Sequence, residues 1–151
     1  MRFRLCVVGR PRDKALAAAI ADYEGRASRY WPLAIHEVKG AAAASAEAAQ
    51  TAESERLVRA AGDALLVVCD EHGTSLASRP FAAWLQSLRE EARDVAFLIG
   101  GAHGVSGNVR HGAHRLLALA PWTLPHELAR LVLAEQLYRA GTIQKGEPYH
   151  K

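Results

Sequence analysis

The chain has 151 residues, half of them hydrophobic, and a formal net charge of +3 at pH 7, which suits one domain with its own core. It contains no run of about 18 apolar residues, so we expect no membrane segment. Its charged N-terminus, MRFRLCVVGRPRD, is unlike a secretory signal. We therefore expect a single cytoplasmic domain over residues 1–151. Lys and Arg outnumber Asp and Glu in residues 1–40 and 101–151 but not between them, which permits a phosphate-facing surface and, equally, a solvated surface of mixed sign.

The N-terminal part of the chain predicts a strand, a helix and a second strand. Residues 2–9 alternate between polar and apolar side chains and then become apolar, which is typical of a strand entering a sheet. After a break, an apolar stripe with helical spacing predicts a helix over residues 13–28. The sequence LAIHEV predicts the next strand at residues 33–38.

Residues 40–55 are rich in alanine and low in hydrophobic bulk, which predicts a mobile linker running into a helix that ends near Gly62. The nearly unbroken apolar run ALLVVCD, residues 64–70, is typical of a strand buried on both faces. A loop, EHGTSLAS, is expected to follow this strand. Ser78 is then expected to cap a helix that has Pro80 in its first turn.

The rest of the chain continues the alternation of strands and helices. The expected elements, in order, are a buried strand at 95–100, a Gly-rich loop at 101–107, a short helix near 108–112, a strand at 114–119, a loop at 120–127, a long helix at 126–140 and a tail to residue 151. This order predicts an α/β fold with a mostly parallel sheet flanked by helices.

Both cysteines, Cys6 and Cys69, lie inside strand-like apolar runs. We interpret them as small buried hydrophobic residues rather than as a disulfide or metal ligands. The sequence also lacks the CxxC and HxxxH spacings of zinc sites. No metal is therefore expected.

Three predicted strands end in unusual loops, at residues 70–73, 100–104 and 120–125. The carboxyl ends of parallel strands gather at one edge of a sheet and bind ligands there. Glycines in the second loop are expected to admit a ligand close to the backbone and to take positive φ. The third loop offers apolar walls and backbone polar groups suited to a purine and its ribose. Neither a dinucleotide fingerprint nor a Gly-Lys-Ser/Thr phosphate loop is present.

The stretch FLIGGAHGV, followed by TLPHELARLVLAEQLYRA and the terminal PYHK, closely resembles the RlmH family of the SPOUT superfamily, whose members methylate N3 of a pseudouridine in helix 69 of 23S rRNA. The resemblance covers the whole chain and is densest over residues 95–151. It implies a SPOUT-type α/β knot, in which the C-terminal segment forms a deep trefoil knot that ordinary topology rules would not predict. It also implies S-adenosyl-L-methionine as cofactor, a homodimer, and 23S rRNA in the assembled ribosome as partner.

By position, the resemblance implies cofactor contacts from three parts of the chain, namely Cys69, the glycines Gly100, Gly101 and Gly104, and the stretch Leu119, Ala120, Pro121, Trp122, Thr123 and Leu124. The chain departs from the family at two places, where the family usually has Leu for Cys69 and a Pro-Glu pair for Ala102-His103. Backbone contacts survive both changes, and His103 offers a polar contact in place of the glutamate.

Transfer of a methyl group to an imide nitrogen requires a deprotonated nucleophile held about 3–3.5 Å from the methyl carbon, and a base that titrates near neutral pH points to histidine. His126 and His150 lie in the motifs that carry the resemblance, although His126 equally suits a capping or packing role. In a resembling dimer, Tyr149 and His150 would lie near the partner's cofactor pocket and orient the target base. A frayed end is the alternative.

Residues 127–140 are apolar on nearly every side of a helical wheel, so this helix needs wide coverage by a core or a second subunit. Glu135 and Arg139 are four residues apart and are expected to pair. Because an isolated buried charge is costly, we interpret Arg139 as an organiser of a dimer interface or active site, with a solvated pair as the alternative. Weaker candidates for phosphate contacts are Arg2, Arg4, Arg10, Arg12 and Lys14.

Three other functions remain open. A different knotted methyltransferase, acting on tRNA ribose, would be expected to carry an added RNA-binding domain or a catalytic arginine in the N-terminal motif. A non-catalytic ribosome-binding protein with the same fold is favoured by the altered Ala102-His103 pair. A nucleotide-dependent oxidoreductase is opposed by the missing dinucleotide fingerprint.

Overall fold

The computed structural model, which describes residues 1–151, contains one five-stranded sheet with the strand order β2-β1-β4-β3-β5. Every strand pairing is parallel. The strands are β1 (Phe3–Val8), β2 (Leu33–Val38), β3 (Leu65–Ser75), β4 (Val95–Ile99) and β5 (Arg115–Ala118). The predicted α/β fold with a parallel sheet is therefore confirmed.

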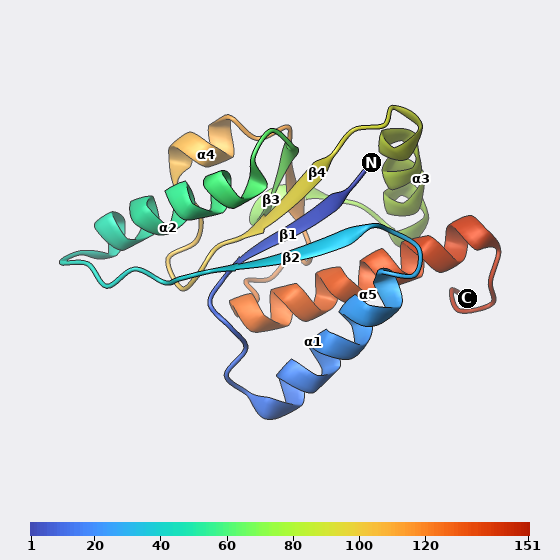
Figure 1. Ribbon diagram of the computed structural model, residues 1–151, viewed down its shortest axis with the longest axis horizontal. Coiled ribbons are helices and arrows are strands. Elements are labelled where there is room, and N and C mark those ends of the chain that lie inside the picture. Colours follow the sequence, from blue (N-terminus) through green and yellow to red (C-terminus); the bar gives the residue numbers. More distant parts are fainter.

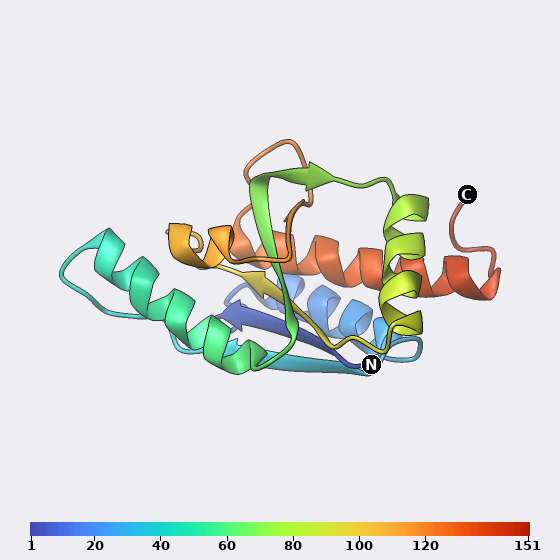
Figure 2. The same cartoon turned by 90° about the horizontal axis from the view of Figure 1, so that it is seen from above.

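Helices connect the strands and cover both faces of the sheet (Figures 1 and 2). They are α1 (Lys14–Ala27), α2 (Ala46–Ala61), α3 (Ser78–Glu90), α4 (Gly107–His111) and α5 (His126–Lys145). None of them is long and apolar enough to cross a bilayer.

The alternating side chains of the strands build two separate cores. Phe3, Leu5 and Val7 of β1 belong to the larger core, which also contains residues of α1, α3 and α5. Cys6 and Val8 point to the opposite face and join the smaller core, which α2 closes with Leu57 and Ala61. A strand buried on both faces reads as a continuous apolar run, which explains the pattern of β1 and β4.

The segment predicted as a linker over residues 40–55 is largely helical, so that prediction is wrong from Ala46 onward. Ser45 caps α2 by accepting a hydrogen bond from the Ala48 backbone N–H at 3.1 Å. Alanine has the highest helix propensity, and small side chains let the helix lie close to the sheet. The helix ends at Gly62 as predicted, where φ is +58°.

The boundaries of β3 and α3 also differ from expectation. The predicted loop at 71–78 is part of β3 as far as Ser75, with the register shifted between Cys69 and Thr74 opposite β5. Ser78 is not a cap, because Ala77 holds that position without a side-chain bond. The Ser78 hydroxyl instead donates to Gln136 Oε1 at 2.9 Å and ties α3 to α5.

Helix α5 runs to Lys145, five residues beyond the predicted end, so the free tail shrinks to residues 146–151. Tyr30, which follows α1, packs against Gly141 inside the helix, and a Cβ at this position would lie 2.3 Å from the Tyr30 ring. The coverage expected for this apolar helix comes from the chain itself. Leu133, Leu137 and Ala140 are buried in the core that α5 shares with α1 and α3.

Candidate functional site

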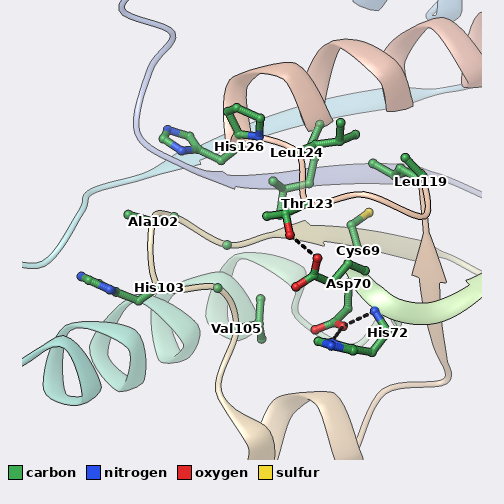
Figure 3. Close-up of a pocket in the computed structure, with 18 of the residues that line it drawn as sticks. Cys69, Asp70, His72, Ala102, His103, Val105, Leu119, Thr123, Leu124 and His126 are labelled. Carbon is green, nitrogen blue, oxygen red and sulfur yellow. Dashed lines mark hydrogen bonds and ion pairs between the residues drawn. The ribbon is translucent and has the colours of Figure 1, made fainter.

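A cavity of about 740 Å³ opens at the carboxyl ends of β3, β4 and β5, which is within the usual range for small-molecule sites. The three loops singled out from the sequence meet there (Figure 3), and residues of α2, α4 and α5 complete the lining. The lining residues are Gln50, residues 69–72, residues 99–105, Arg110, Leu119, Ala120, residues 122–126 and Ala129. Segments far apart in the sequence therefore form one site.

Most of the predicted cofactor-contacting residues line this cavity. They are Cys69, Gly100, Gly101, Gly104, Leu119, Ala120, Trp122, Thr123 and Leu124. Pro121 is exposed and is not among the lining residues. His126 lines the cavity as the first residue of α5, and its side chain makes no capping hydrogen bond. The structure therefore gives no support to the capping role that the sequence left open for His126.

Several lining residues were missed by sequence reasoning. Gln50 lies in the segment taken for a linker, and Arg110 lies on a five-residue helix with no distinguishing pattern. Ile99 and Ala129 belong to predicted elements, but nothing in their spacing indicated that they reach a cavity. Only the contact between distant segments identifies these residues.

The glycines of the second loop were expected to take positive φ and to admit a ligand close to the backbone, and the structure agrees only in part. Only Gly104 has positive φ, at +72°. A Cβ on Gly100 would lie 2.5 Å from the Gly104 backbone, and a Cβ on Gly101 would lie 2.9 Å from Glu53 Oε2. Close packing within the protein, rather than ligand access, explains the absence of side chains at Gly100 and Gly101.

Asp70 organises the polar side of the cavity (Figure 3). Its Oδ1 accepts a hydrogen bond from the His72 backbone N–H at 2.8 Å, and its Oδ2 lies 3.4 Å from Arg110 Nη1. The adjacent Glu71 accepts a hydrogen bond from the Thr123 hydroxyl. These contacts join the bulged part of β3 to α4 and to the third loop.

Cys69 forms part of the apolar wall. Burial, followed by the nearby charge of Asp70, raises the pKa of its thiol from 9.0 to about 12. Burial likewise raises the pKa of Cys6 to about 11. Because the thiolate is the nucleophilic form, neither cysteine acts as a nucleophile at neutral pH.

The raised thiol pKa values predict that the protein loses stability at alkaline pH. Above pH 9 the unfolded chain releases the Cys69 proton while the folded chain retains it up to about pH 12, so the free energy of unfolding falls as pH rises through this window. At pH 10, one unit above the pKa of the unfolded thiol, each such thiol lowers the free energy of unfolding by about 1.4 kcal/mol. Urea titrations should show that the free energy of unfolding falls less between pH 8 and pH 10 for Cys69→Ala than for the unchanged protein. Equal falls in the two proteins would contradict the raised pKa of the Cys69 thiol.

The other candidate catalytic residues gather at the opposite end of α5. Glu135 Oε1 accepts from Arg139 Nε at 2.9 Å and from the Tyr149 hydroxyl at 3.0 Å. Arg139 Nη1 lies 3.2 Å from His150 Nδ1, and its guanidinium lies 4.7 Å from the centre of the Tyr149 ring. Burial and the hydrogen bonds of its hydroxyl raise the pKa of Tyr149. The Glu135–Arg139 pair is therefore present as predicted, and Tyr149 and His150 pack against it instead of fraying.

This group does not reach the cavity of its own chain. Arg139, Tyr149 and His150 are absent from the lining residues. At about 1.5 Å of rise per residue, Arg139 lies about 20 Å along α5 from His126. A site that combines the cavity with Arg139, Tyr149 and His150 would need the end of α5 from a second copy of the chain.

The candidate phosphate contacts are of two kinds. Arg4 is half-buried and donates to the Ala61 carbonyl at 2.5 Å, so it is a structural residue. Arg10 is 90% exposed in its side chain and lines a small hollow between the end of β1 and the start of α5. The Arg12 backbone N–H donates to Glu127 Oε1 at 2.8 Å, which fixes this loop against the start of α5.

Comparison with known proteins gives consistent results. A family model described as a predicted SPOUT methyltransferase matches residues 1–150. A protein of Gemmatimonas aurantiaca named ribosomal RNA large subunit methyltransferase H is 59% identical over 154 aligned residues, covering 100% of both chains. A protein of the same name from Geobacter metallireducens is 41% identical over 152 residues, covering 99% of both chains.

A solved structure shows the same fold at low sequence identity. It is a probable methylase family protein from Haemophilus influenzae, with a TM-score of 0.56 and 14% identity. The match covers 99% of this chain and 70% of that chain. At this identity the similarity concerns the fold alone.

Proposed function

The chain belongs to the SPOUT methyltransferase family and to its group of ribosomal RNA large subunit methyltransferases H, and from this premise we propose that it transfers a methyl group from S-adenosyl-L-methionine to N3 of a pseudouridine in helix 69 of 23S rRNA. The observation that carries the proposal is the 59% identity over the full length of a relative with that name. We further propose that it acts on an assembled ribosomal surface rather than on a free RNA.

The cavity suits this cofactor in size and chemistry. Its apolar walls, which include Ile99, Leu119 and Leu124, can hold an adenine ring, and the loop backbone between β5 and α5 offers hydrogen-bonding groups. The carboxylates of Asp70 and Glu71 lie at the same cavity and can accept hydrogen bonds from a ribose or an amino group. When bound, the cofactor supplies an electrophilic methyl group.

The residues of the chain then have to orient the target base and remove its imide proton. His126 is exposed at the cavity and is one candidate for holding that proton. Arg139 is fixed by Glu135 and in turn fixes Tyr149 and His150. We assign Arg139, Tyr149 and His150 to orientation of the target base, since positioning supplies much of the rate of an in-line displacement.

We also propose that the active form is a homodimer, with the end of α5 of one copy placed beside the cavity of the other. The separation of about 20 Å along α5 within one chain supports this arrangement. Tyr149 and His150 are held by their own chain, so they can be presented as a rigid group. Each dimer would contain two such composite sites.

Family membership further supports a C-terminal trefoil knot in this chain. In that arrangement the segment from the third loop into α5 passes through a loop of the chain. The same segment provides residues 122–126 of the cavity wall. The proposed knot would thus hold one wall of the cofactor site rigidly in place.

The proposed activity is tested by methyl transfer from labelled S-adenosyl-L-methionine to ribosomes of a strain that lacks this protein. We expect one labelled pseudouridine, modified at N3, when the product is mapped by mass spectrometry. Naked rRNA fragments of the same sequence provide the control and should accept little label. Absence of label with intact cofactor binding would refute the substrate, whereas absence of both would favour a non-catalytic ribosome-binding protein.

A further inference from the structure

A polar face of α2, made by Gln50, Glu53 and Ser54, contacts the Gly-rich loop. Gln50 Nε2 donates to the His103 carbonyl at 2.7 Å, and Ser54 Oγ accepts from the Ser106 backbone N–H at 2.9 Å. Glu53 lies between them on the same helix face, because residues three and four apart are neighbours on a helix. Helix α2 therefore fixes the loop that forms one wall of the cavity.

Glu53 is the exceptional member of this face. It is 7% exposed, and its Oε1 accepts only the Ala41 backbone N–H, at 3.1 Å. Its Oε2 has no hydrogen-bond partner, and none of the ion pairs in the structure involves it. A buried carboxylate without a cationic partner is costly, so its presence calls for a reason.

The free oxygen of Glu53 lies directly behind the cavity wall. A Cβ built on Gly101 would meet Glu53 Oε2 at 2.9 Å, and Gly101 itself lines the cavity. Because Gly101 has no side chain, the carboxylate can lie close to the backbone of a residue that lines the cavity. In such a poorly solvated position a charge acts over several ångströms with little screening.

The other two acidic residues at the cavity differ from Glu53 in their surroundings. Asp70 lies beside His72 and Arg110, and Glu71 accepts from Thr123. Neither Glu53 nor Glu71 has a cationic partner, but Glu53 is the buried one of the two. Its position favours a ligand that carries a positive charge near Gly101.

We infer that Glu53 is a specificity-determining residue, whose unpaired carboxylate stabilises the positive charge of a sulfonium methyl donor in the cavity. This inference rests on the proposed function, since it assigns a role toward the same cofactor. Loss of the methyl group converts the sulfonium to a neutral thioether, so the charge of Glu53 distinguishes the donor from its product. Gln50 and Ser54 are positioning residues that shape the loop without providing that distinction.

The test compares binding of S-adenosyl-L-methionine and S-adenosyl-L-homocysteine by calorimetry. Glu53→Gln removes the charge with little change in shape and should weaken binding of the sulfonium about tenfold, while binding of the neutral thioether changes less than about twofold. Glu55→Gln, an equal change at an exposed position of α2, should alter neither affinity. Glu53→Asp keeps the charge and should retain most of the selectivity, which also covers the case in which Glu53→Gln folds poorly.

The possible outcomes separate this inference from the proposed function. Equal weakening of both ligands in Glu53→Gln, with Glu53→Asp behaving the same way, would show a structural role and overturn the inference. Unchanged binding in both variants would also overturn it. If the unsubstituted protein binds neither ligand, the proposed function fails together with the inference. Gln50→Ala should weaken both ligands alike, which marks the effect expected of a residue that only positions the loop.

Discussion

Replacing Arg130 with alanine should lower the free energy of unfolding by about 3–5 kcal/mol. The side chain of Arg130 is 6% exposed, and its Nε lies 2.6 Å from Glu24 Oε1 of α1. Its Nη2 lies 3.6 Å from Glu37 Oε1 of β2. Removal of the guanidinium would leave Glu24, whose side chain is 12% exposed, without its cationic partner between α1 and α5.

Thermal and urea denaturation would measure this effect, and for a chain of this size it corresponds to a drop of roughly 10 °C in Tm. Arg10→Ala is a matched control, because Arg10 also lies near Glu37, at 3.8 Å, but its side chain is 90% exposed. An exposed pair is worth at most about 1 kcal/mol. Similar losses for the two variants would show that burial of the Arg130 pair has no special importance.

Mixing two inactive variants should restore activity if the site is shared between subunits. Arg139→Ala would free His150 and Tyr149 from their fixed positions, and misplacement of an orienting group by about 1 Å costs about 100-fold in rate. Ala120→Trp would place a large ring in the cavity, which Ala120 lines, and should block cofactor binding. Neither variant alone should methylate ribosomes at a measurable rate.

In a mixed dimer, one composite site combines the unchanged cavity of one copy with the unchanged α5 end of the other. When equal amounts are unfolded and refolded together, half of the dimers are mixed and each has one intact site, so about a quarter of the original activity should return. Each variant refolded alone is the control. A site contained within a single chain would give no recovery, and a monomeric mass in solution would exclude the arrangement altogether.

Local sequence patterns were sufficient for most elements of the fold. The apolar runs of β3 and β4 predicted buried strands because a strand covered on both faces needs apolar side chains at successive positions. They also indicated which strand ends carry the loops of the site. The pattern failed at the start of α2, whose buried residues include the polar Glu53 and Ser54 beside Ala49, Leu57 and Ala61. In sequence, buried polar residues look the same as solvated ones.

The remaining differences concern contacts between distant segments. A glycine near a predicted helix end usually marks a stop, but Gly141 lies inside α5, where it leaves room for Tyr30 from the segment after α1. The register shift of β3 depends on its pairing with β5. Neither partner is encoded near the residue that it affects, so local periodicity cannot reveal it.

By itself, the sequence determined the parallel α/β fold of residues 1–151 and which three loops meet at the cavity, because both follow from the order and polarity of local elements. Only the tertiary structure decided that Glu53 lies close to Gly101 with one oxygen lacking a hydrogen-bond partner. It also decided that Arg139, Tyr149 and His150 lie away from the cavity of their own chain. Those facts depend on distances between residues far apart in the chain. Such distances are set by the packing of whole elements against one another, which no local pattern records.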